Sequence, residues 1–140
     1  IGELSQTFCV PEDITKVSFW WKFYSEEFIE FCGSAYQDAF EGTMTADIGG
    51  GEQVLNLVST NIDKLCPPDA CSGCGEMYES LVESSVLFDQ DGVWNTEWRQ
   101  VSMDITQFSG QGPVTLRFFT GDKTDTLYDT AILIDSLVFE

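Results

Sequence analysis

Hydrophobic and polar residues alternate along several stretches of this chain, most regularly over residues 16–24. Phe19, Trp21 and Phe23 occupy every second position there, and a lysine lies between two of them. Successive side chains of a β-strand point to opposite faces of a sheet, whereas a helix repeats about every 3.6 residues. The segment is therefore predicted to be a strand with one face in the core, and Trp21 is expected to be buried.

The same period of two predicts further strands. They cover residues 39–46, 53–59, 80–88, 99–105, 114–120 and 130–139. The last of these is apolar on both faces, which is typical of a strand in the centre of a sheet. Residues 61–78 do not follow the pattern, because they contain three cysteines, and they are expected to form a loop excursion with a short helix.

Glycine-rich and aspartate-rich clusters separate the predicted strands and are typical of turns. Short strands joined by such turns, without a long stretch of helical period, are typical of all-β architectures. The chain has 140 residues, which is the size of one domain. We therefore expect a single domain over residues 1–140, an antiparallel β-sandwich (jelly roll) with a cysteine-rich loop excursion.

The charge of the chain narrows its possible partners. It has 24 acidic residues against six lysines and arginines, no histidine and a net charge of -18. Binding of nucleic acid or of an anionic membrane depends on lysine and arginine, so neither is an expected partner. No apolar run approaches the about 20 residues that a membrane-spanning helix needs, so no membrane span is expected.

The first residue and the cysteines point to a cellular compartment. The chain begins at Ile1 rather than methionine and contains five cysteines. We interpret it as a mature, processed protein or an excised domain. Cysteines at this frequency, without histidine to share a metal site with them, are typical of disulfides in exported proteins. The expected location is secreted or on the cell surface.

The cysteines allow two kinds of site. The disulfide candidates are Cys9, Cys32, Cys66, Cys71 and Cys74. Two intrachain disulfides would use four of them and leave the fifth as a buried thiol or as a link to another molecule. A zinc site would need one upstream cysteine to join the three that are close in sequence, whereas strong zinc sequences carry two C-x-x-C pairs. Disulfides are the favoured interpretation.

Acidic residues cluster in loops that an antiparallel sandwich can bring to one end. The candidate metal ligands are Glu26, Glu27, Asp38, Asp122, Asp125 and Asp129. Grouped carboxylates repel one another unless a cation lies among them, and hard oxygen ligands favour calcium over transition metals. We therefore expect a calcium site, the alternative being a solvated acidic rim. Asp89 and Asp91, in a D-x-D-G turn, are candidates for a second metal site or form a plain polar turn.

Four of these acidic segments resemble a known family. The segments read FYSEEFIEF at residues 23–31, YQDAF at 36–40, GD at 121–122 and YDTAILID at 128–135. They resemble motifs of the bacterial surface domains called choice-of-anchor L and of related secreted jelly-roll modules, although Gln37 stands where that family usually has asparagine. The resemblance implies an extracellular or cell-surface β-sandwich without known catalysis.

Few residues are suited to catalysis. Without histidine, the usual general base and the Ser-His and Cys-His nucleophile systems are absent. A glycoside hydrolase needs two carboxylates across one bond, but the adjacent Glu26 and Glu27 would point to opposite faces of a strand. The protein is therefore expected not to be an enzyme, and glycoside hydrolysis is the enzymatic alternative.

A carbohydrate-binding module of a larger adhesin is an alternative function. Trp94 and Trp98 lie near the turn at residues 89–92 and are candidates for stacking on a sugar ring. Tryptophans of a β-sandwich belong more often to its core, which is also the expectation for Trp98. Exposure of the indoles distinguishes the two interpretations.

Together these features predict a non-catalytic, calcium-binding, extracellular protein that serves adhesion or a structural assembly such as a surface fibre. Self-association through β-strand pairing is the expected interaction, with calcium reducing the repulsion between copies. Residues 1–10 are the candidate donor strand. The alternative is an intramolecular first strand in a monomeric module.

Overall fold

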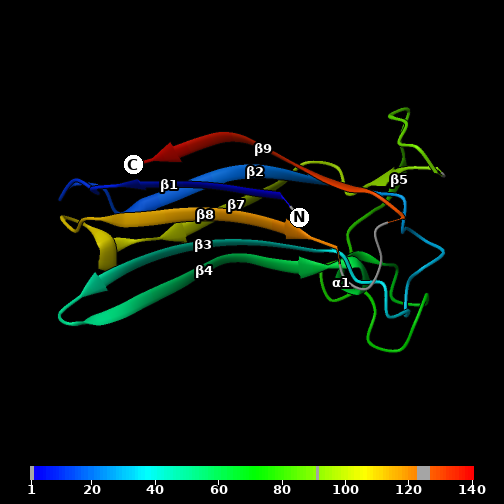
Figure 1. Ribbon diagram of the computed structural model, residues 1–140, viewed down its shortest axis with the longest axis horizontal. Coiled ribbons are helices and arrows are strands. Elements are labelled where there is room, and N and C mark those ends of the chain that lie inside the picture. The colour runs from blue at the N-terminus through cyan, green and yellow to red at the C-terminus, as the bar shows by residue number, and fades with distance from the viewer. Residues whose placement is uncertain (1, 91, 123–126) are drawn as a thin grey trace.

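Two antiparallel sheets face each other in the computed structural model, which describes residues 2–90, 92–122 and 127–140 (Figure 1). The first sheet has the strand order β1-β8-β3-β4. Its strands are β1 (Gly2–Phe8), β8 (Val114–Gly121), β3 (Ala39–Ile48) and β4 (Gly51–Asn61). Every pair of neighbours in it is antiparallel.

The second sheet is built around β2 (Lys16–Ser25), the aromatic strand. One side of β2 pairs with β9, and the other pairs with β7 and then β6, while β5 extends the sheet beyond β6. These strands are β9 (Thr130–Phe139), β7 (Arg99–Asp104), β6 (Trp94–Asn95) and β5 (Val82–Glu83). The described helices are the short α1 (Ile62–Leu65) and the 3-10 turn η1 (Thr106–Phe108).

Aromatic side chains fill the space between the two sheets. The alternating residues of β2 are almost fully buried, including Trp21, which is 2% exposed, so its core position is confirmed. Phe19 contacts Phe118 of β8 with ring centroids 5.0 Å apart, and Trp21 contacts Phe40 of β3 at 5.5 Å. Burial of each such side chain contributes about 1.5–3 kcal/mol, so the alternation in β2 accounts for much of the contact between the sheets.

The all-β sandwich is confirmed, and most of the predicted strands agree closely with the observed ones. Two of the strand predictions are wrong. The segment at 130–139 does not lie in the centre of a sheet: among the described strands, β9 pairs only with β2 and forms an edge. Residues 80–88 form a strand only at Val82–Glu83, because the rest of that segment is an exposed loop in which Leu87 is 83% exposed.

The first strand pairs within its own chain. β1 aligns with β8 from the Gly2 pair with Thr120 to the Phe8 pair with Val114. It forms the edge of its sheet and lies on the same side of the sandwich as β9, whereas β4 lies on the opposite side (Figure 1). Residues 2–8 are therefore part of the fold, and an intermolecular role for them would use the free edge of β1.

The cysteine-rich excursion contains the short helix that was expected between residues 61 and 78. Asn61 caps α1, since its side chain accepts a hydrogen bond from the backbone N–H of Lys64. Gln37 and Asp63 are joined by two hydrogen bonds of 2.8 and 2.9 Å. The start of the excursion is thereby fixed against the loop that precedes β3.

The expected two intrachain disulfides are confirmed, and the structure shows their pairing, which the sequence left open: Cys32–Cys66 and Cys71–Cys74. Cys9 is the free cysteine, and it is exposed, so the expectation of a buried thiol is wrong. Disulfides of this kind are typical of an oxidising, extracellular environment. In the described part of the chain, no helix has both the length and the apolar character to cross a membrane.

The two disulfides are expected to differ in their contribution to stability. Cys32 and Cys66 are 34 residues apart, while Cys71 and Cys74 are three apart. The loop-closure entropy relation gives about 4 kcal/mol for the long loop and about 2 kcal/mol for the short one. Urea unfolding of the double variants Cys32→Ala/Cys66→Ala and Cys71→Ala/Cys74→Ala should show this order. A larger loss from the second pair would contradict it.

Candidate metal centre

Glu26 follows the last residue of β2, where that strand pairs with the start of β9. Ser25 is aligned with Thr130, and their hydroxyls form a hydrogen bond of 2.9 Å. The backbone N–H of Glu26 then donates to the carbonyl of Asp129 at 3.1 Å. The strand pairing therefore continues by one contact beyond β2 and places Glu26 beside the loop that precedes β9.

The carboxylate of Glu26 is 1% exposed and joins two loops. Its Oε1 accepts from the backbone N–H of Gln90 at 2.9 Å, and its Oε2 accepts from the backbone N–H of Asp129 at 2.8 Å. Hydrogen bonds to an ionised acceptor are stronger than those between neutral groups, and they satisfy a buried carboxylate. Glu26 thus brings together two loops that lie far apart in the sequence.

Three carboxylates meet at this point. Carboxylate oxygens of Glu26, Asp89 and Asp129 all lie within 4.8 Å of one another. Glu26 is buried, while Asp89 and Asp129 are exposed, so the group has a closed base and a solvent-accessible rim. Three oxygens at such distances can contact a single cation, with water or backbone carbonyls completing its coordination.

The electrostatics of the cluster are unfavourable without a cation. Desolvation raises the pKa of the Asp129 carboxyl above its ordinary value, and the negative charges of Asp89, Glu26 and Asp122 raise it further. A hydrogen bond with Asp89 acts in the same direction. Folding therefore holds like charges together at this end of the sandwich.

The basic residues of the described chain are engaged elsewhere. Their partners are Glu140 for Lys16, Tyr24 for Lys22, Glu76 for Lys64, Glu79 for Arg99 and Glu3 for Arg117. The remaining one, Lys123, lies outside the described residues. None of the groups that shift the pKa of Asp129 is basic. Among the described residues, no lysine or arginine therefore compensates the negative charge of the cluster.

Glu27 and Asp38 form a neighbouring acidic contact. They are 0% and 1% exposed, and the backbone N–H of Asp38 lies 3.4 Å from Oε2 of Glu27. The N–H of Glu27 itself donates to the hydroxyl of Ser25 at 3.0 Å. Neither carboxylate belongs to the group around Glu26, but both are buried in the segment that follows it.

The predicted metal ligands have three different outcomes. Glu26 and Asp129 come together, and they are joined by Asp89, which the sequence assigned to a second site. Asp122 is near enough for its charge to affect Asp129. Asp91 and Asp125 lie outside the described residues. The sequence carried no signal for the contact of Glu26 with the backbone of Gln90, because it depends on tertiary folding.

A second group with metal-ligand chemistry lies in the excursion. Ligand atoms of Asp63, Cys66 and Cys74 lie within 4.8 Å of one another. Both cysteines are bonded in disulfides, so they have no thiolate to offer to zinc in this oxidation state.

The two candidate tryptophans have different environments. Trp94 is partly buried and packs against the core. Trp98 is 40% exposed, so the expectation that it belongs to the core is wrong. Its position just before β7 turns the indole away from the buried face that the next residue, Arg99, occupies.

Comparisons of the chain with protein-family models, with curated proteins and with solved structures found no match.

The repulsion within the cluster predicts a stabilising substitution. In excess chelator, Asp129→Asn is expected to raise the urea midpoint at pH 7, because it removes one of the repelling charges. The pKa of Asp129 is raised in the folded state, so its ionised form destabilises the fold at pH above that pKa. The advantage of the variant should therefore disappear as the pH falls below the ordinary value of 3.8.

The control for this substitution is Asp47→Asn, which changes an exposed carboxylate in β3. It removes the same charge from the chain but not from the cluster, so a smaller effect on the midpoint is expected. A lower midpoint for Asp129→Asn than for wild type, in chelator at pH 7, would contradict the interpretation.

Proposed function

We propose that this protein is a non-catalytic, calcium-binding, extracellular domain that serves adhesion or a structural assembly. The observation that carries the proposal is the convergence of Glu26, Asp89 and Asp129 within 4.8 Å, with the buried Glu26 at its base. A divalent cation between these three carboxylates would compensate their negative charge, which no described lysine or arginine does.

The chemistry of the cluster favours calcium over other metals. All three groups are carboxylates, and the chain has no histidine. Calcium accepts such hard oxygen ligands in a flexible geometry, whereas magnesium requires near-ideal octahedral coordination. Two ligands on exposed loops around one fixed carboxylate suit the more flexible ion.

Two further features support an extracellular role. The disulfides are typical of an oxidising compartment, where calcium is abundant enough to fill sites of moderate affinity. The resemblance of residues 23–31 and 128–135 to choice-of-anchor L domains agrees with this, since Glu26 and Asp129 lie in those two segments. We propose the same secreted or cell-surface location for this chain.

The edge formed by β1 and β9 supports self-association through strand pairing. Both strands are edges of their sheets, and adjoining cavities of about 340, 310 and 180 Å³ lie between them. The lining is largely apolar and includes Leu4, Phe118, Ile132 and Leu137. Unpaired edges beside an apolar groove are the features to which a strand of another copy can add.

Calcium is expected to raise the melting temperature. Binding to the native state alone adds about 2.7 kcal/mol when calcium is about a hundredfold above its dissociation constant. Asp89→Asn and Asp129→Asn should each reduce the shift between chelator and millimolar calcium, while Asp47→Asn should keep it. An unchanged melting temperature of the wild type in calcium would overturn the proposed site.

Calcium-dependent association is expected to depend on one side of the sandwich. Leu4→Lys combined with Leu133→Lys places charges on β1 and β9 at exposed positions and should abolish strand pairing there. Val54→Lys, on the exposed edge strand β4 of the opposite side, should leave association unchanged. Light scattering at high protein concentration in calcium measures both. Monomeric wild type under these conditions would remove assembly from the proposal.

A further inference from the structure

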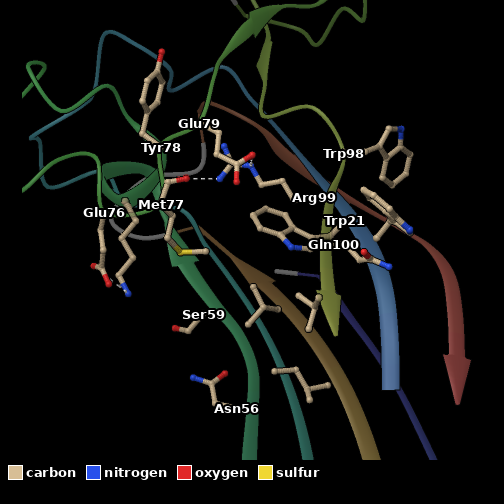
Figure 2. Close-up of a pocket in the computed structure, with 15 residues that line it drawn as sticks. Trp21, Asn56, Ser59, Glu76, Met77, Tyr78, Glu79, Trp98, Arg99 and Gln100 are labelled. Atoms are coloured by element: carbon tan, nitrogen blue, oxygen red, sulfur yellow. Dashed lines mark hydrogen bonds and ion pairs between the residues drawn. The ribbon is translucent and has the colours of Figure 1, made fainter. Parts of the chain in front are cut away.

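A groove of about 790 Å³ lies on the side of the sandwich opposite to β1 and β9. It runs between the edge strands β4 and β7 and is bounded by residues 76–79, where the excursion ends (Figure 2). Its lining is mixed, with aromatic, amide, hydroxyl and charged side chains. It shares no residue with the acidic cluster, so its function is a separate question.

Arg99 is the buried polar group of this groove. Its side chain is 6% exposed, and its guanidinium lies 5.6 Å from the ring centroid of Trp21. Nη1 donates to the carbonyl of Met77, as the dashed line in Figure 2 shows. Nε and Nη2 have no hydrogen-bond partner among the residues that the structure describes. Buried donors are normally satisfied, so two such donors beside a groove indicate a missing acceptor.

The charges of the groove are balanced but loosely paired. Nε of Arg99 lies 4.0 Å from the carboxylate of Glu79, and Nζ of Lys64 lies 3.8 Å from that of Glu76. Both distances exceed that of a hydrogen bond, so charge is compensated while donors and acceptors remain available. A hydroxyl fits between such partners, because it accepts from a cation and donates to a carboxylate.

The rim of the groove offers aromatic surface. Trp98 and Trp20 are 40% and 38% exposed, and both line the groove. Asn56 and Gln100 add amide groups, which both donate and accept. Aromatic faces with amides and hydroxyls around them suit a ring that is apolar on its faces and polar at its edge.

We propose that this groove binds a neutral oligosaccharide. One pyranose ring lies against Trp98, and a hydroxyl of a neighbouring ring occupies the position between Arg99 and Glu79. Arg99 and Trp98 are consecutive residues whose side chains diverge (Figure 2), so a chain of several rings is needed to contact both. An acidic saccharide is a poorer fit, because two glutamates line the groove and the protein carries a charge of -18.

The test uses isothermal titration with three neutral probes, namely cellohexaose, mannohexaose and xylohexaose, and one acidic probe, a galacturonate oligosaccharide. At least one neutral probe is expected to bind at millimolar concentration or below. Trp98→Ala should weaken that binding at least about tenfold, because it removes the stacking surface. Leu4→Ala, at an exposed position on the opposite side of the sandwich, should leave it unchanged.

Arg99 and Glu79 are tested by conservative variants, with the melting temperature of each measured beside its binding. Arg99→Lys retains the charge but not the fork of donors, and about tenfold weaker binding is expected. Glu79→Gln changes a side chain that is 77% exposed, so binding should weaken while the melting temperature stays unchanged. A lower melting temperature with unchanged binding would show that Glu79 only compensates Arg99 and would overturn the proposed contact.

Three other outcomes would overturn the proposal as a whole. They are absence of binding by every neutral probe at millimolar concentration, binding that Trp98→Ala leaves unchanged, and binding of the galacturonate probe alone. The last result would assign the groove to an anionic ligand through Arg99.

Discussion

The buried carboxylate of Glu26 is the contact on which the arrangement of the acidic end depends. It accepts hydrogen bonds from the backbones of Gln90 and Asp129, so two loops that share no strand are held by one side chain. Because those loops carry Asp89 and Asp129, the same hydrogen bonds that satisfy Glu26 also bring its charge close to theirs. The cluster is thus a consequence of satisfying a buried ion, and its repulsion is relieved by protonation or by a cation.

The two open sides of the sandwich differ in chemistry. Between β1 and β9 the cavities are lined largely by leucine, isoleucine and phenylalanine. Between β4 and β7 the groove has a mixed lining and contains Arg99, the buried basic residue of the described chain. An apolar edge suits contact with another protein surface, whereas a mixed groove with unsatisfied donors suits a small polar ligand. The two proposed contacts would therefore use opposite sides of the sandwich and would not compete for the same surface.

The sequence predicted the strands whose alternation is strong and the loop in which the cysteines lie. β2, with Phe19, Trp21 and Phe23 in register, is the clearest case, because burial of one face leaves a period of two in the sequence. The same reasoning failed for β9 and Trp98. An apolar edge strand that borders a groove has the same composition as a central strand, and an exposed indole on a strand has the same spacing as a buried one. Both distinctions depend on neighbours that the local pattern does not contain.

The sequence predicted that acidic residues would meet at one end of the sandwich, but it did not predict which of them would do so. Asp89 lies in the loop that precedes β6. It meets Glu26 only because β6 pairs with the end of β2, which brings this loop next to the residue that follows β2. That topology also connects the acidic cluster to the apolar edge. Asp129 immediately precedes β9, and it is bound to Glu26 in both directions, by its carbonyl and by its N–H. Because the only strand that pairs with β9 among those described is β2, a cation that holds Asp129 against Glu26 would also fix the start of this edge strand. Under the proposed function, calcium occupancy and the availability of the β9 edge are expected to vary together, since both would depend on the contact between Glu26 and Asp129.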